Sequence, residues 1–195
     1  MPLGDSITQG VGSSTGAGYR GPLEQLLGQD VDFVGSQRGG PIPDPNHEGH
    51  SGYMIGQLGD GIDGWLALAQ PDVVLLHAGI NDLDRGQGDG AAGRLLALIT
   101  HIKADRPGSV VLVMGLIPTT GGVEQQAVRF NAALRAHAGE AFTYVEPPSL
   151  GPDDMADRLH PNDAGYQRLA EAFGIPLAQV TSKTPPGVQC PPPPE

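Results

Sequence analysis

DVVLLH, residues 72–77, is an unbroken run of β-branched and leucine side chains between an aspartate and a histidine. SVVLVM, residues 109–114, has the same character. Continuous apolar runs of about four to eight residues are typical of parallel strands, because both faces of such a strand lie against a core. The two runs therefore predict the central strands of a buried sheet.

Weaker apolar segments and helical patterns surround these two runs. Three further segments are predicted to be strands: residues 1–3, 31–34 and 142–146. Apolar residues recur at helical spacing in four segments: residues 19–27, 55–68, 90–104 and 123–137. Asn162 is a suitable N-cap for a last helix, which we expect to run to about Phe173. Strands that alternate with helices predict a three-layer α/β/α domain with a central, mostly parallel sheet.

The composition limits the partners that the protein can have. The chain has 195 residues, enough for one domain with a substantial core, and a formal net charge of −11. This acidity argues against a nucleic-acid partner, which requires a basic surface. No apolar run approaches the roughly 18 residues that a membrane span needs, so no membrane partner is expected. The single cysteine, Cys190, excludes an intramolecular disulfide and a thiolate metal cluster.

The apolar pattern stops after Leu177, and the composition then becomes rich in proline. Thr184-Pro185-Pro186-Gly187 and the four prolines at 191–194 favour an extended, polyproline-type conformation. We therefore expect one folded domain over residues 1–181 and a tail or linker over residues 182–195. The tail is either a disordered end or a linker to a further module, and the stiffness of consecutive prolines favours the linker.

Candidate functional residues follow the predicted strands. Ser6 lies in Gly4-Asp5-Ser6-Ile7-Thr8, directly after the first apolar segment, and Asn81 lies in Gly79-Ile80-Asn81-Asp82, after residues 72–77. His160 follows the last predicted strand. Ligands of open parallel sheets bind beyond the carboxyl ends of the strands. We therefore expect Ser6, Asn81 and His160 to meet at one edge of the sheet.

Asp157-Arg158-Leu159-His160 places a carboxylate three residues before an imidazole. Residues at i and i+3 face the same way, so Asp157 can accept a hydrogen bond from His160 Nδ1 while Nε2 faces a hydroxyl. With Ser6 as that hydroxyl, the three residues would form a nucleophilic triad. The alternative is an Asp–His pair that only caps the last helix.

Two residues are candidates for stabilising an oxyanion, which requires donors aimed at developing negative charge. Asn81 offers its side-chain amide. Gly52, in His47-Glu48-Gly49-His50-Ser51-Gly52-Tyr53, can bring a backbone N–H close to a substrate because it lacks a Cβ. The alternatives are an Asx-turn at Asn81 and an ordinary turn at Gly52.

Together these segments resemble the four ordered sequence blocks of the GDSL/SGNH hydrolase superfamily, and the Ser6 and Gly52 segments are most similar to its acetylxylan-esterase branch. The resemblance extends from Met1 to about Phe173. It implies a flavodoxin-like fold, with Ser6 as the nucleophile, His160 as the base and Asp157 as its partner. It also implies an oxyanion hole made by the Ser6 N–H, the Gly52 N–H and the Asn81 side chain, without a metal or a cofactor. One departure is the strand before Ser6, normally a full apolar run and here only three residues long.

The function implied by this resemblance is that of a serine esterase. Its substrate would be an acetylated plant cell-wall polysaccharide such as acetylated xylan, or a small ester, and we expect a secreted monomer. Two alternatives stay open. One is a short-chain lipid esterase, lysophospholipase or thioesterase of the same fold, and the other is a non-catalytic carbohydrate-binding module. The presence of all three triad residues together with Asn81 favours an enzyme.

Other segments suggest ligand sites, but each departs from the required pattern. Residues 10–16 are glycine-rich but lack the Lys-Ser/Thr end of a phosphate-binding loop. His47-Glu48-Gly49-His50 lacks the helical spacing of a zinc site. Asp82-Leu83-Asp84 lacks the terminal glutamate of a calcium loop. Trp65 fits the apolar stripe of its helix, which predicts a core position rather than a sugar platform.

Overall fold

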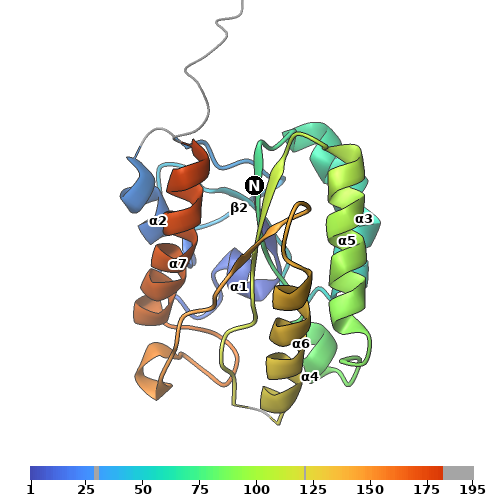
Figure 1. The fold of residues 1–195 in the computed structure, drawn as a ribbon. Coiled ribbons are helices and arrows are strands. Elements are labelled where there is room, and N and C mark those ends of the chain that lie inside the picture. Colours follow the sequence, from blue (N-terminus) through green and yellow to red (C-terminus); the bar gives the residue numbers. More distant parts are fainter. Residues whose placement is uncertain (29–30, 121, 182–195) are drawn as a thin grey trace, which may run out of the picture.

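The computed structural model describes residues 1–28, 31–120 and 122–181 (Figure 1). The strands are β1 (Pro2–Gly4), β2 (Gln37–Arg38), β3 (Asn46–Gly49), β4 (Val73–His77), β5 (Val110–Met114) and β6 (Thr143–Val145). The helices are α1 (Ser6–Gln9), α2 (Arg20–Leu27), α3 (Ile55–Ala69), α4 (Ile80–Asp84), α5 (Ala91–Asp105), α6 (Glu124–His137), the 3₁₀ helix η2 (Pro152–Asp154) and α7 (Asp163–Thr181). The proline-rich tail predicted over residues 182–195 lies outside the described residues.

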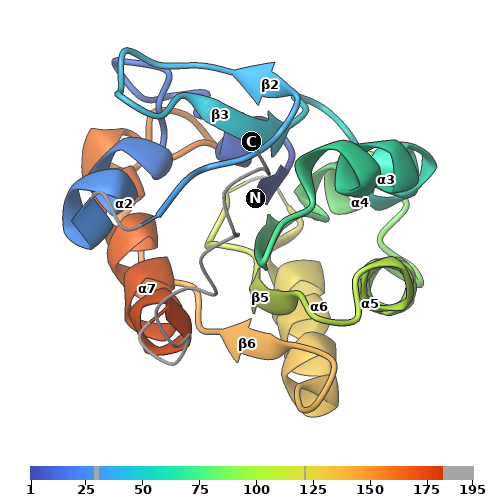
Figure 2. The ribbon, with the colours of Figure 1, turned by 90° about the horizontal axis from the view of Figure 1, so that it is seen from above.

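The strands form one sheet in the order β2-β3-β1-β4-β5-β6. The pairs β3–β1, β1–β4, β4–β5 and β5–β6 are parallel, and β2 pairs with β3 as an antiparallel edge strand. The parallel strands follow the flavodoxin-like order, in which the first strand lies between the second and the third. Figure 2 shows α2 and α7 on one face of the sheet and α3, α5 and α6 on the other. The structure confirms the predicted three-layer α/β/α fold.

The two apolar runs form the centre of the core. In both β4 and β5 all residues but the first are buried, and Val74 lies opposite Val111 in the register of the two strands. The helices cover them with residues that recur at the spacing of one helix face. In α3 these residues are Ile55, Leu58, Ile62 and Leu66. Each of the four helices predicted between residues 19 and 137 begins and ends within one residue of the observed bounds.

β1 has only three residues, yet it is the strand at which the strand order reverses. It is paired on both sides, with Leu3 lying opposite Glu48 and Leu76. A Cβ on Gly4 would lie 2.1 Å from the carbonyl oxygen of His77, so the close approach of β1 and β4 requires glycine. Two neighbours and complete burial therefore compensate for the short length of this strand.

One predicted strand is wrong, and two observed strands, β2 and β3, were not predicted. Residues 31–34, which the structure describes, form no strand. Phe33 is buried in the core, but its N–H donates to the carboxylate of Asp44 instead of to a neighbouring strand. The position beside β1 is occupied by β3, whose sequence Asn46-His47-Glu48-Gly49 contains no apolar side chain.

α7 begins where the sequence predicts and runs further than expected. Asn162 Oδ1 accepts hydrogen bonds from the N–H groups of Ala164 and Gly165, which makes Asn162 the N-cap. The helix continues through Pro176 to Thr181, although we expected it to end near Phe173. Leu177 packs in the core at 2% exposure, so burial stabilises the additional turns.

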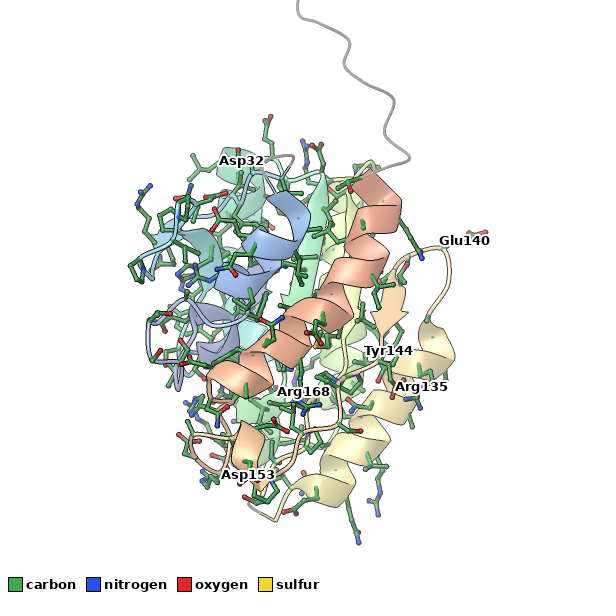
Figure 3. The ribbon with its side chains drawn as sticks, turned by 90° about the vertical axis from the view of Figure 1, so that its left-hand side faces the viewer. Asp32, Arg135, Glu140, Tyr144, Asp153 and Arg168 are labelled. Atoms are coloured by element: carbon green, nitrogen blue, oxygen red, sulfur yellow. The ribbon has the colours of Figure 1, made fainter. Side chains whose placement is uncertain are left out.

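Arginine side chains on two helices contact neighbouring elements of the fold. Figure 3 shows Arg135 of α6 beside Tyr144 of β6, and the guanidinium carbon lies 5.1 Å from the ring centroid. Arg168 of α7 donates to Asp154 of η2 at 3.1 Å.

No helix in the described part of the chain is long and apolar enough to cross a membrane.

Two buried histidines make the fold sensitive to acid. Burial lowers the pKa of His77 to about 4, and burial together with the nearby charges of Arg20 and His50 lowers the pKa of His47 to about 3. Below the ordinary value of 6.5, an unfolded chain protonates these rings while the folded protein keeps them neutral. The stability that they contribute is complete above about pH 6.5 and falls as the pH approaches 4.

We predict that His77→Leu makes the free energy of unfolding less sensitive to acid. Between about pH 7 and pH 4.5 the wild type should lose up to about 3 kcal/mol more than the variant, because the leucine takes up no proton on unfolding. Denaturant titrations at the two pH values measure this difference. The exposed His137→Leu is the control and should follow the wild type. Equal acid sensitivity of His77→Leu and the wild type would contradict the prediction.

Candidate active site

Ser6 lies at the carboxyl end of β1, where the chain turns directly into α1. Asp5 is the N-cap of this helix, and its Oδ1 accepts a hydrogen bond from the Ile7 N–H at 3.0 Å. Because Ser6 is the first residue of the helix, no helical carbonyl can accept from its N–H. The strand-to-helix turn thus leaves both the hydroxyl and the N–H of Ser6 outside the hydrogen bonds of the helix.

Ser6, His160 and Asp157 form a hydrogen-bonded row. His160 Nε2 lies 3.0 Å from Ser6 Oγ, and His160 Nδ1 lies 2.8 Å from Asp157 Oδ2. Asn162, rather than the Asp157–His160 pair, caps α7. The row has the geometry for proton transfer from the hydroxyl to the imidazole, with the carboxylate stabilising the charged ring.

Asp157 is held in its ionised form. Partial burial raises the pKa of its carboxyl, but hydrogen bonds from the His160 ring and from two backbone N–H groups outweigh this effect and lower the pKa below its usual value. The backbone donors are Leu159 and His160, which reach Oδ1 at 2.7 and 2.8 Å. The side chain is 52% exposed, so solvent screens its charge, and the main effect of Asp157 is to orient the imidazole.

The glycine-rich residues 10–16 support the segment that carries the imidazole. Gly12 has a φ of +94°, and a Cβ there would lie 2.5 Å from the carbonyl oxygen of Pro161. The backbone carbonyl of Val11 accepts a hydrogen bond from Tyr166 Oη at 2.6 Å. The glycines therefore allow close packing against the histidine segment, which explains a composition that resembles a phosphate-binding loop.

Arg158, within the Asp157–His160 segment, connects that segment to α4. Its Nη1 and Nη2 donate to the two oxygens of Asp84 at 2.6 and 2.9 Å, a bidentate ion pair. Asp82 accepts from Arg94 Nη2 at 2.9 Å. Both aspartates of the segment that resembles a calcium loop thus have arginine partners. This connection could not be predicted from the sequence pattern, because the two members of the pair lie 74 residues apart.

Gly52 and Asn81 belong to two segments that contact each other. Asn81 Nδ2 donates to the carbonyl oxygen of Tyr53 at 3.0 Å, which uses one of the two protons of the amide. The Tyr53 N–H donates to His50 O at 3.1 Å, so residues 50–53 form a turn with Gly52 in its third position. Gly52 has a φ of +76°, which glycine adopts without strain. The structure thus brings the Asn81 side chain against the Gly52 turn.

The three residues considered as zinc ligands do not converge. Glu48 Oε1 lies 2.6 Å from His50 Nε2, whereas His47 precedes Glu48 in the strand and points to the other face of the sheet. Within the described residues, three side chains of the metal-binding kind do gather elsewhere on the surface, namely Asp63, His101 and Asp105.

A model of the GDSL-like lipase/acylhydrolase family matches residues 3–168. The chain belongs to this family. The match includes all three members of the hydrogen-bonded row, and the fold is that of the SGNH hydrolases, as the sequence blocks imply.

This GDSL hydrolase has both curated and structurally solved relatives. It is 30% identical over 210 residues to a multidomain esterase of Ruminococcus flavefaciens, a match that covers 88% of this chain and 27% of that protein. A family 3 carbohydrate esterase of Clostridium thermocellum is 34% identical with a TM-score of 0.83, covering 93% of this chain and 96% of that chain. A family 3 carbohydrate esterase of Talaromyces cellulolyticus is 26% identical with a TM-score of 0.77, covering 95% and 98%.

Asp5 of this GDSL hydrolase is a buried carboxyl directly beside Ser6. Burial raises its pKa to about 7, against the opposing effects of the Ile7 N–H and the charge of His160. A carboxyl with a raised pKa in the folded state costs stability when it ionises. This cost is absent below about pH 3.8, grows as the pH rises and is complete above about pH 7.

We predict that Asp5→Asn stabilises the folded protein in a pH-dependent way. Its gain in unfolding free energy should be up to about 4 kcal/mol larger at pH 8 than at pH 4, because the amide carries no charge and can still accept from Ile7. Denaturant titrations across this range measure the gain, with the exposed Asp60→Asn as control. A gain or loss that is constant with pH would show that the Asp5 pKa is not raised.

Proposed function

We propose that the protein is a serine esterase that removes acetyl groups from a plant cell-wall polysaccharide such as acetylated xylan. The observation that carries this proposal is the row in which His160 Nε2 lies 3.0 Å from Ser6 Oγ and Nδ1 lies 2.8 Å from Asp157. Such a row is the arrangement that activates a serine hydroxyl for attack on a carbonyl carbon.

Acylation is the first half of the proposed reaction. His160 Nε2 accepts the proton of Ser6 while Oγ forms a bond to the acetyl carbonyl carbon, and the carbonyl electron pair moves onto its oxygen. The tetrahedral intermediate then collapses, and the bond between the carbonyl carbon and the sugar oxygen breaks. The sugar oxygen takes the proton from His160 and leaves as a free hydroxyl, so the acetyl group is now an ester of Ser6.

Deacylation follows the same path with water in place of the serine. His160 accepts a proton from the water, whose oxygen attacks the acetyl carbon of the acyl-enzyme. Collapse of the second intermediate returns the proton to Ser6 Oγ and releases acetate. In both halves the negative oxygen is stabilised by the Ser6 N–H, the Gly52 N–H and the Asn81 amide, the three donors that the family resemblance implies.

The relatives support a polysaccharide substrate. Two of them are family 3 carbohydrate esterases that cover nearly the whole chain. The curated relative is a multidomain esterase, of which this chain spans 27%. The multidomain organisation of that relative supports our proposal that this chain is a catalytic domain with further modules beside it. We also propose that the protein acts outside the cell as a monomer. An acetylated neutral sugar also carries no charge that the acidic protein would repel.

One feature beside the triad favours a second candidate function. A cavity of about 330 Å³ adjoins Asp157, and its lining includes the apolar side chains of Pro118, Leu150, Pro152 and Met155. Such a lining could take a short acyl chain, because each buried methylene contributes about 0.8 kcal/mol. The second candidate is therefore a short-chain lipid esterase or thioesterase that uses the same row of residues.

We predict that Ser6→Ala and His160→Ala each lower kcat for p-nitrophenyl acetate, and the release of acetate from acetylated xylan, by about 10⁴-fold or more. The double variant should be no worse than either single variant, because the two residues act as one unit. Thermal unfolding of each variant is the control for folding. Turnover by Ser6→Ala at the wild-type rate would exclude the serine mechanism.

A series of acyl lengths separates the two candidate functions. We predict that kcat/KM decreases from p-nitrophenyl acetate through butyrate to octanoate, and that acetylated xylan is deacetylated. An acyl chain bound in the cavity beside Asp157 would instead raise kcat/KM with each methylene, by up to about fourfold. An octanoate preference without acetate release from xylan would favour the lipid or thioester substrate.

A further inference from the structure

Glu48 is a buried carboxylate that the mechanism above does not use. It has 0% exposure, although glutamate is rarely buried without partners. Its Oε1 accepts from Ser36 Oγ at 2.7 Å and lies 2.6 Å from His50 Nε2. Its Oε2 accepts from the Ser36 N–H at 2.7 Å. Three donors therefore converge on this carboxylate, and the imidazole of His50 is one of them.

The His50 ring is also held on both faces. Its centroid lies 4.8 Å from that of Tyr53, with an interplanar angle of 20°, and 4.4 Å from that of Trp65, with an angle of 17°. Trp65, for which the sequence predicts a core position, is only partly buried: it packs against the core and also contacts this imidazole. The hydrogen bond to Glu48 and the two stacked rings together fix the orientation of His50.

The backbone of His50 is anchored next to the nucleophile. Its N–H donates to the carbonyl oxygen of Gly4 at 2.9 Å, two residues before Ser6. A Cβ on Gly49 would lie 2.5 Å from the backbone nitrogen of Gln9, so the end of β3 packs directly against α1. A displacement of His50 would therefore also displace α1, the helix that begins with Ser6.

The two ends of the Gly52 turn are the two residues whose rings are stacked. His50 O accepts from the Tyr53 N–H at 3.1 Å, and Tyr53 O accepts from Asn81 Nδ2 at 3.0 Å. Gly52 lies between them with a φ of +76°, the value that a type II turn requires in its third position. This conformation sets the direction of the Gly52 N–H. The same turn thus carries one oxyanion donor and contacts the other.

We propose that Glu48 and His50 are positioning residues for the oxyanion hole: they hold the turn at residues 50–53 so that the Gly52 N–H and the Asn81 amide point at the developing oxyanion. This inference rests on the proposed function, because it takes these two groups as the donors. Oxyanion donors act over about 2.7–3.1 Å, and the loss of one donor costs about 10²–10³ in kcat. A change at Glu48 or His50 would displace the turn for only part of the time, so it should lower kcat by less than the loss of a whole donor.

The first test is Glu48→Gln, which keeps the size of the side chain and removes its charge. We expect kcat for p-nitrophenyl acetate to fall about 10- to 100-fold while KM changes by less than about twofold, because the oxyanion forms only after the substrate is bound. A purely structural role would lower the midpoint of thermal unfolding and leave the kcat of the folded enzyme unchanged.

Two variants at His50 separate its hydrogen bond from its stacking. His50→Phe keeps an aromatic ring between Tyr53 and Trp65 but has no donor for Glu48, and His50→Gln keeps a donor but no ring. Both should lower kcat with little change in KM. Ser36→Ala removes a donor to Glu48 at an exposed residue, and it keeps the proposal testable if Glu48→Gln fails to fold. Its kcat should fall by about two- to fivefold.

The matched control is Ser109→Ala, which also removes a side-chain hydroxyl that is hydrogen-bonded to the protein. Ser109 Oγ donates to Pro71 O next to the start of β5, at the end of the sheet away from Ser6. This variant should lose stability without a change in kcat.

The outcomes distinguish the inference from the function on which it rests. Wild-type kcat in Glu48→Gln, His50→Phe and Ser36→Ala, with Ser6→Ala inactive, would overturn the positioning role and leave the esterase proposal intact. A higher KM at unchanged kcat would also overturn it, because it would indicate a role in substrate binding. Wild-type turnover in Ser6→Ala would overturn the esterase proposal and this inference together.

Discussion

The edge of the sheet that carries the candidate active site depends on the hydrogen bonds of one guanidinium, that of Arg20. The side chain is fully buried, and burial lowers its pKa. A guanidinium has five N–H donors, and here all five reach backbone carbonyls. The acceptors are Thr8, Gln9, Gly16, Gly39 and Pro45. Irregular loops leave carbonyl groups that regular structure would satisfy, so a single side chain supplies the donors that join α1, the glycine-rich loop and the β2–β3 region.

The strand order also reverses at this edge. Each of three neighbouring strands is followed by one part of the candidate site. Ser6 follows β1, the Gly52 turn follows β3 and Asn81 follows β4. The histidine segment approaches from the other end of the chain and is fastened by Arg158 to Asp84 and by the packing of Gly12 under Pro161. The sheet thus fixes the distances between the groups, while polar contacts between loops fix their directions.

The parts of this molecule that could be predicted are those where local chemistry agrees with the fold. β4 and β5 are apolar because both faces are buried, and the helix patterns locate their helices closely. β3 was missed because backbone pairing with β1, rather than apolar side chains, makes Asn46-His47-Glu48-Gly49 a strand. The Ser6, Asn81 and His160 segments could be located from their order, but the Arg158–Asp84 pair and the partners of Glu48 depend on contacts between distant segments.

The hydrogen bond between His160 and Ser6 joins residues that are 154 positions apart in the chain. Closing so long a loop is slow compared with forming a helix or a hairpin, because entropy is lost before the distant contact can compensate for it. During synthesis Ser6 therefore emerges 154 residues before its partner His160. The Ser6–His160 hydrogen bond is thus a contact that can form only after every strand of the sheet has been made.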